Sequence, residues 1–302
     1  MPTLSVVISV YNGEKYLAAC LSSVKDFADE IIVVDHESSD STVAIAKKFT
    51  KKIYSQKNNP ADIDRQKNFG FDKATKDWTL SLDADESLTD EVKKEIQKTL
   101  SENTKLVGFW IPRKNIIFEK WIAHTGWYPD YQMRLFKSGM GKYVNKHVHE
   151  DLFVEGETGR LTAPIMHEAY QSVYQFLHRG LTVYAPNEAE ALIEKGYTFS
   201  FADSIRFPVR EFLSRYFARY GFKDGFHGLI LSLLMACYHF AVFCYLWEHE
   251  KFVEKHESLS ILAKGVAGSQ KEFHYWIDTA RLEQTRNPAS KILLKTKRKL
   301  GL

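Results

Sequence analysis

Three carboxylates at the end of a short apolar run form the most chemically suggestive segment of the chain. The run 78–82 is typical of a buried strand, and Asp83, Asp85 and Glu86 follow it directly. Like charges this close repel one another and need a counter-charge, yet the motif contains no lysine that could supply it. At the carboxyl end of a strand, oxygen ligands favour Mg²⁺ or Mn²⁺, which binds one or two carboxylates together with substrate phosphates. A solvated acidic turn before the next helix is the alternative interpretation.

The surrounding segments alternate between strands and helices. Strands are predicted at 4–10, 30–35, 52–56 and 78–83, and helices at 17–24, 43–47, 63–74 and 90–100. This alternation predicts an α/β fold with a mainly parallel sheet, flanked by helices, and a ligand crevice at the strand ends. Asp35 and Asp83 each end a strand, so both are expected in that crevice. No glycine-rich phosphate loop follows the first strand, which disfavours dinucleotide and P-loop binding.

Four motifs in this order resemble the inverting glycosyltransferases of family 2, which have the GT-A fold. The motifs are Val7 to Glu14, Ile31 to Thr42, Arg65 to Asn68, and Trp78 to Glu86. Residues 126–136 and 148–150 are similar to a subgroup that contains bacterial lipopolysaccharide-core β-glucosyltransferases. The resemblance implies a GT-A catalytic domain over 1–185, and the rest of the chain, 186–302, is expected to be a helical, membrane-associating region.

The resemblance also implies which residues bind a nucleotide-sugar donor. They would be Tyr11, Glu14, Asp35, Arg65, Asn68, Asp83 and Arg134. Tyr11 and Glu14 would line the base pocket, and Asp35 would contact the uracil or ribose. Arg134 is expected to face the diphosphate, with a surface ion pair as the alternative.

A divalent cation, Mg²⁺ or Mn²⁺, is the expected cofactor. By the resemblance, Asp85 would be its main ligand and a catalytic residue, and Asp83 would lie beside it. His167 would be a third metal ligand or a diphosphate donor, although a purely structural histidine is an equal alternative.

Transfer with inversion also needs a carboxylate base on the face opposite the leaving diphosphate. Glu150 matches the position where relatives carry the catalytic acidic residue. Asp151 and Asp130 are rival candidates, and Glu150 would otherwise only orient its neighbours.

Composition agrees with an intracellular enzyme. The chain has 302 residues, a formal net charge of +3 and three cysteines. Its length suits one GT-A domain with an appendage, and its mild charge gives no indication of nucleic-acid binding. The cysteines do not suggest a disulfide framework, and the first strand begins so early that no signal peptide is expected.

The carboxyl-terminal third combines aromatic, basic and apolar segments. A helix over 208–220 would place aromatic residues on one side and Arg210, Arg215 and Arg219 on the other, and an uncharged stretch follows at 225–247. The segment 291–299 is basic and amphipathic. These features predict helices that lie in or dip into the inner leaflet, with basic residues on an anionic membrane surface. Packing against the catalytic domain or a second subunit, and a true span, are the alternatives.

Together these expectations predict transfer of a hexose, glucose from UDP-glucose, to a membrane-linked saccharide such as lipopolysaccharide core. The expected location is the cytoplasmic face of the bacterial inner membrane, and homo-oligomerisation stays open. Three other functions remain: a polyprenyl-phosphate or polypeptide glycosyltransferase, a non-catalytic nucleotide-sugar-binding protein, and a sugar nucleotidyltransferase. The last is disfavoured because its glycine-rich, basic loop after the first strand is missing.

Overall fold

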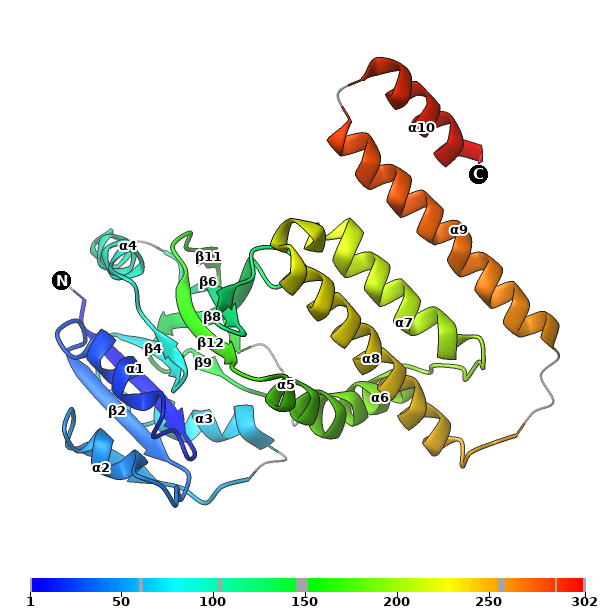
Figure 1. Ribbon diagram of the computed structural model, residues 1–302. Coiled ribbons are helices and arrows are strands. Elements are labelled where there is room, and N and C mark those ends of the chain that lie inside the picture. Colours follow the sequence, from blue (N-terminus) through cyan, green and yellow to red (C-terminus); the bar gives the residue numbers. More distant parts are fainter. Residues whose placement is uncertain are drawn as a thin grey trace. The chain divides into compact units, whose positions relative to one another are not determined.

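The computed structural model describes residues 2–59, 62–102, 105–144, 152–254, 259–285 and 287–300. It divides into two units (Figure 1). The first consists of Met1–Trp121 and Tyr128–Ala169, and the second of Ile122–Trp127 and Tyr170–Leu302. The chain therefore passes between the units three times.

The first unit contains a mixed sheet with helices on both faces. Its strands are β1 (Leu4–Val10), β2 (Glu30–Asp35), β3 (Lys52–Ser55), β4 (Trp78–Asp83), β5 (Glu86–Ser87), β6 (Gly108–Ile117), β7 (Lys120–Trp121), β8 (Asp130–Lys137), β9 (Gly141–Lys142), β10 (Phe153–Val154), β11 (Thr158–Arg160) and β12 (Ile165–Tyr170). Its helices are α1 (Leu17–Val24), α2 (Thr42–Ala46), α3 (Ile63–Phe71) and α4 (Asp90–Ser101). The predicted strands and helices of the first hundred residues are confirmed, although α3 ends three residues earlier than expected.

The sheet has the strand order β3-β2-β1-β4-β8-β6-β12-β5. Strands β3, β2, β1 and β4 are parallel, and their register aligns Val10 with Asp35 and Ser9 with Asp83. The carboxyl ends of β1, β2 and β4 therefore meet at one edge, as the sequence predicts. Beyond β4 the sheet becomes antiparallel, through β8 and then β6.

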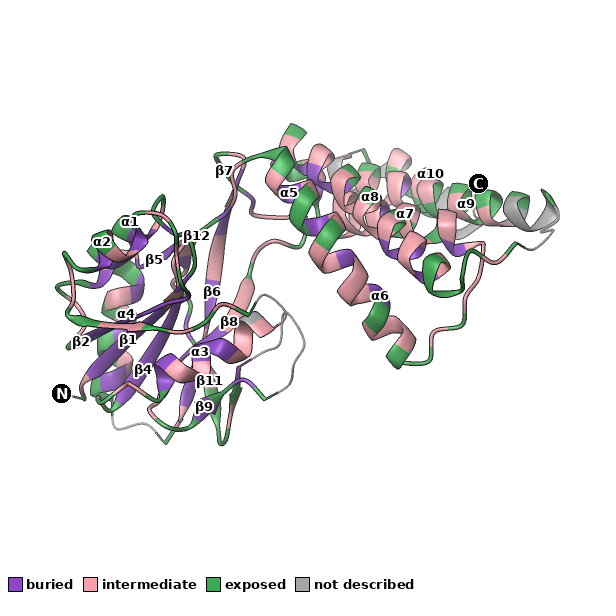
Figure 2. Cartoon of the chain, turned by 90° about the horizontal axis from the view of Figure 1, so that it is seen from below, coloured by how far each residue is buried: buried purple, intermediate pink, exposed green. Residues whose placement is uncertain are grey.

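Two apolar layers hold this sheet between helices. One face packs against α1, α2 and α4 through residues such as Leu21, Ala46 and Ile96. The other face packs against α3, where Phe71 meets Val34 and Phe136. Because both faces are covered, β1 and β2 are almost continuously apolar and appear buried along their length in Figure 2.

The second unit is helical. Its elements are α5 (Val173–Arg179), the π-helical turn η2 (Gly180–Tyr184), α6 (Ala185–Glu194), α7 (Asp203–Leu213), the π-helical turn η3 (Ser214–Ala218), the 3₁₀ turn η4 (Gly221–Asp224), α8 (Phe226–His249), α9 (Leu259–Gln284) and α10 (Pro288–Leu300). Helix α8 packs against α6 and α7, and α7 also packs against α9. The apolar stretch predicted at 225–247 is therefore α8.

One expectation about the basic helix needs correction. Arg215 does not lie on an outward basic face: its side chain is largely buried, pairs with Glu211 and donates to the Thr125 carbonyl at 2.9 Å. On the aromatic side, Phe212 packs against Tyr216 and Phe217, and the Phe212 ring centroid lies 5.9 Å from that of Phe273 in α9. Packing within the helical unit accounts for this part of the pattern.

Candidate active site

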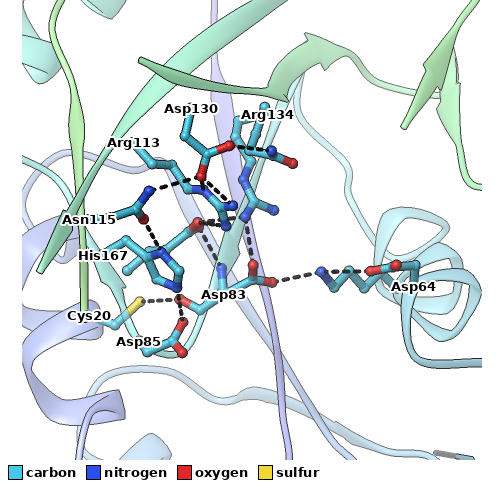
Figure 3. Close-up of polar contacts among 12 residues, drawn as sticks. Cys20, Asp64, Asp83, Asp85, Arg113, Asn115, Asp130, Arg134 and His167 are labelled. Carbon is cyan, nitrogen blue, oxygen red and sulfur yellow. Dashed lines mark hydrogen bonds and ion pairs between the residues drawn. The ribbon is translucent and has the colours of Figure 1, made fainter. Parts of the chain in front are cut away.

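Asp83, the last residue of β4, is neutralised by cationic side chains of the chain itself. Its carboxylate accepts from Lys67 Nζ at 2.7 Å and from Arg134 at 2.6 Å (Figure 3). Burial alone would raise the pKa of Asp83, but Arg134 and Lys67 outweigh it and hold the pKa well below its usual range. The motif itself contains no lysine, but α3 brings Lys67 to Asp83 from sixteen residues earlier in the chain.

Glu86 links the Asp83 backbone to two arginines in the same site. Its buried carboxylate accepts from the Asp83 backbone N–H at 2.9 Å and from Arg134 at 2.5 Å, and Arg113 lies 3.4 Å away. Arg134 is thus committed to two carboxylates and is almost fully buried. The structure places it at the centre of the acidic cluster, whereas the sequence suggested that it faces a diphosphate.

Asn115 connects Asp130 to His167 through hydrogen bonds. Asn115 donates through Nδ2 to Asp130 at 3.1 Å, and its Oδ1 lies 2.6 Å from His167 Nδ1. Since the amide oxygen can only accept, Nδ1 must be the protonated ring nitrogen. Burial and the nearby Arg113 lower the pKa of His167 to about 3, so the ring is neutral at neutral pH. Nε2 therefore carries a lone pair.

This lone pair lies beside Asp85. His167 Nε2 is 3.7 Å from Asp85 Oδ1 (Figure 3), so two electron-donating groups approach each other. The connected cluster includes the carboxylates of Asp64, Asp83, Asp85, Glu86 and Asp130. Lys67, Arg113 and Arg134 are cationic partners within it. A carboxylate beside an imidazole nitrogen that carries a lone pair fits a divalent cation.

The described residues offer this cation few ligands. Within the part of the chain that the structure describes, no three histidine, cysteine, aspartate or glutamate side chains form a metal-binding group. Asp85 and His167 would supply two ligands, and the remainder would come from water and substrate oxygens, which is common for Mg²⁺. Asp83 fits a ligand role less well because Lys67 and Arg134 already occupy its carboxylate.

Three of the predicted donor-binding residues lie at or just after the carboxyl ends of β1 and β2. Tyr11 is exposed beyond β1, and Asp35 is buried at the end of β2, where it accepts from Ser38 N–H. Glu14 accepts from the Ser41 backbone N–H at 3.0 Å and so links the loops that follow the two strands. The structure therefore places these residues at the carboxyl edge of the sheet.

Arg65 and Asn68 make structural contacts on α3. Arg65 pairs with Asp62 at 2.6 Å. Asn68 forms two hydrogen bonds of 2.9 Å with the backbone of Tyr143, which attach α3 to the chain after β9. Neither contact tests donor binding. Glu150 and Asp151 lie outside the described residues.

The sequence reasoning missed four members of the cluster. These are Asp64, Lys67, Arg113 and Asn115. A signal existed in β6, where Arg113 and Asn115 alternate on the face that also carries the buried Ile111 and Ile117. Polar residues in an otherwise buried alternation indicate an interior polar site.

The chain is similar in sequence to known glycosyltransferases. Residues 5–153 match the model of glycosyl transferase family 2. An uncharacterized glycosyltransferase of Rickettsia typhi is 27% identical over 298 residues, covering 95% of this chain and 97% of the relative. The lipopolysaccharide core biosynthesis glycosyltransferase LpsC of Rhizobium meliloti is 27% identical over 251 residues, covering 78% and 89%. The chain is therefore a glycosyltransferase. It belongs to family 2, and its first unit has the GT-A fold.

Among solved structures, the chain is similar to residues 1–349 of S. aureus TarS in complex with UDP-GlcNAc. The sequence identity is 14%, and the TM-score is 0.45. The match covers 99% of this chain and 92% of that one.

Proposed function

We propose that the chain is an inverting, metal-dependent glycosyltransferase that moves a hexose to a hydroxyl of a membrane-linked saccharide such as lipopolysaccharide core. Glucose from UDP-glucose is the proposed donor. Residues 1–185 would form the catalytic domain, and 186–302 would hold it at the cytoplasmic face of the bacterial inner membrane. The lipopolysaccharide assignment is supported by the similarity to LpsC.

The pair formed by Asp85 and His167 carries the proposal. Asp83, in the same motif, is neutralised by Lys67 and Arg134. Asp85 faces an imidazole nitrogen that carries a lone pair. A bound divalent cation would stabilise the charge that develops on the leaving diphosphate. The chain's own role is to hold these two ligands at a fixed separation.

The base is proposed to be Glu150. It would take the proton of the acceptor hydroxyl as the oxygen attacks the anomeric carbon, while the bond to the diphosphate breaks and the diphosphate leaves with the electron pair. Asp130 is a weaker candidate, since burial raises its pKa but Arg113 and Asn115 outweigh this and lower it. A carboxylate that already accepts from an arginine and two amides has little capacity to take a further proton.

The proposal is tested with purified protein, a panel of nucleotide sugars and membrane extract as the acceptor. We expect UDP-glucose to be used preferentially and EDTA to abolish turnover. Asp85→Asn should do the same, while Asp90→Asn, on an exposed aspartate five residues away, should have little effect. Transfer near the wild-type level in excess EDTA would contradict the metal role, and turnover of another donor alone would contradict the glucose assignment.

The base is tested separately from donor binding. Glu150→Gln should keep donor affinity and lower transfer by about 10²–10⁴-fold, because an amide cannot accept the proton. Asp130→Asn should affect transfer less if Glu150 is the base. Retention of more than about a tenth of the activity in Glu150→Gln would move the assignment to Asp151 or Asp130.

A further inference from the structure

Helix α8 has its polar side chains on the inside. Tyr238 donates to Glu188 of α6, and Tyr245 donates to the Leu181 carbonyl at 2.9 Å. His239 lies between Glu188 and Glu211, at 3.8 and 3.3 Å. These contacts direct the polar residues of α8 toward η2, α6 and α7.

The opposite side of α8 is exposed and apolar. Phe226, Leu233, Cys237 and Phe240 are exposed, and their spacing of seven, four and three residues places them on one stripe. We call these four residues the outer stripe. No charged residue lies between Gly225 and Trp247. A helix on a water-facing surface normally has the reverse arrangement, with the polar side outward.

We propose that the outer stripe is a lipid-binding face, and that α8 lies in the plane of an anionic membrane surface. This deepens the proposed function, because it names the face by which the enzyme reaches a lipid-linked acceptor. By length and composition, α8 is the one helix among the described residues that is able to cross a membrane. The contacts on the inner side of α8 distinguish a helix that lies in the membrane plane from one that crosses the membrane.

A crossing helix would bring charged residues into the hydrocarbon. Glu188, Glu211 and Arg215 lie along the inner side of α8 or next to it, and α7 also exposes Arg206 and Arg210. Each charged side chain at the bilayer centre costs at least about 2.5–3.5 kcal/mol on insertion scales. A helix that lies in the interface leaves these groups on the aqueous side and buries only its outer stripe.

The ends of α8 favour anionic lipid over a second copy of the chain. Lys223 lies over the exposed Tyr220 ring at 4.3 Å, just before α8 begins. After α8 ends, the exposed Phe252 packs edge-on against Trp247, next to the exposed Lys251. Aromatic and lysine side chains at both ends of an apolar segment match the headgroup region of a membrane, where each cation is attracted to anionic lipid.

The first test measures binding of full-length protein to vesicles of phosphatidylethanolamine and phosphatidylglycerol. Leu233→Glu/Phe240→Glu should lower the bound fraction at least about tenfold, because two apolar contacts become charges. The matched control is Val173→Glu/Tyr174→Glu, which changes two exposed apolar residues of α5 in the same unit. Equal binding by wild type and both variants would overturn the proposal.

The second test measures depth. In a Cys237→Ser/Cys244→Ser background, a fluorophore is attached at Phe226→Cys, Leu233→Cys or Phe240→Cys, while the buried Cys20 is left in place. Lipids with a quencher near the headgroup or near the bilayer centre then report the depth of each position. An in-plane helix gives three similar, shallow depths. Depths that progress across the bilayer would overturn the proposal in favour of a span, and absence of quenching with a dimer in solution would overturn it in favour of a second copy.

Donor hydrolysis in solution separates this inference from the proposed function. The vesicle-binding variants should hydrolyse UDP-glucose at the wild-type rate, since the outer stripe lies outside the acidic cluster. If wild type binds vesicles but turns over no nucleotide sugar, the proposed function fails and the lipid-binding face stands. If wild type turns over the donor but does not bind vesicles, the lipid-binding face fails and the proposed transferase activity stands.

Discussion

Two aspartates of one short motif receive different roles from their surroundings. Asp83 and Asp85 are separated by a single residue, yet Asp83 is bound by Lys67 and Arg134 and Asp85 lies next to His167. Asp83 already has two cationic partners, whereas Asp85 and the neutral imidazole of His167 are placed to share a metal ion. The distinction depends on elements distant in sequence, because Lys67 comes from α3, Arg134 from β8 and His167 from β12.

Asn115 is predicted to position His167 for metal binding. Asn115→Leu keeps the volume of a buried side chain but removes the acceptor for His167 Nδ1–H. Loss of such an orienting group typically weakens metal affinity about 10–100-fold. Mn²⁺ binding in the presence of UDP, measured by electron paramagnetic resonance, gives a readout that does not depend on turnover. Unchanged Mn²⁺ affinity in a folded variant would show that Asn115 only fills space.

The strand starts of the first unit are joined by a buried carboxylate at the edge opposite the active site. Glu30, at the start of β2, accepts from Lys52 of β3 and Ser5 of β1. It also accepts from the Thr75 N–H at 2.9 Å and the Thr75 hydroxyl at 2.8 Å. One side chain thereby connects three neighbouring strands and the turn that leads into β4.

Glu30 is predicted to make the first unit sensitive to acid. Burial alone would raise its pKa, but Lys52, Ser5 and Thr75 lower it from 4.5 to about 2. A lowered pKa contributes stability above pH 4.5, and this contribution is lost as the pH falls toward 2. Glu30→Gln should cost about 1–3 kcal/mol at pH 7, discounted because Lys52 is half exposed, and the difference from wild type should vanish near pH 2.

Urea unfolding between pH 7 and pH 2 measures this difference. Glu102→Gln, on an exposed residue at the end of α4, is the control and should leave the profile unchanged. A constant difference between wild type and Glu30→Gln at all pH values would contradict the role of the charge.

At the scale of the whole molecule, the chain enters the helical unit twice: briefly after β7, and again after β12. Residues 122–127 belong to the helical unit, although β7 before them and β8 after them belong to the sheet. The buried carboxylate of Asp224 fixes the segment 122–127 within the helical unit. It accepts hydrogen bonds from the N–H groups of Ala123 and His124 at 3.2 and 2.9 Å, and from the Thr125 hydroxyl at 3.0 Å.

Asp224→Ala is predicted to destabilise the helical unit more than the sheet unit. Removal of the acceptor leaves several partly buried donors unpaired, which should cost about 2–4 kcal/mol. Calorimetry should show a lower unfolding temperature for one transition, while UDP binding at moderate temperature is retained. Glu190→Ala, on an exposed residue of α6, is the control. An unchanged transition would contradict this account of Asp224.

The parallel strands β1 to β4, the acidic motif at the end of β4 and the membership in family 2 could all be predicted from the sequence, but the antiparallel pairing beyond β4 could not. Apolar runs of strand length and the capped helices between them depend on local chemistry, which neighbouring residues reveal. Tertiary structure decided the electrostatics, because Lys67, Arg113, Asn115 and Arg134 reach the motif from distant elements. It also decided the orientation of α8. The sequence of a largely apolar helix does not indicate which of its sides is buried. The contacts of α8 with α6 and α7 show which side is left exposed.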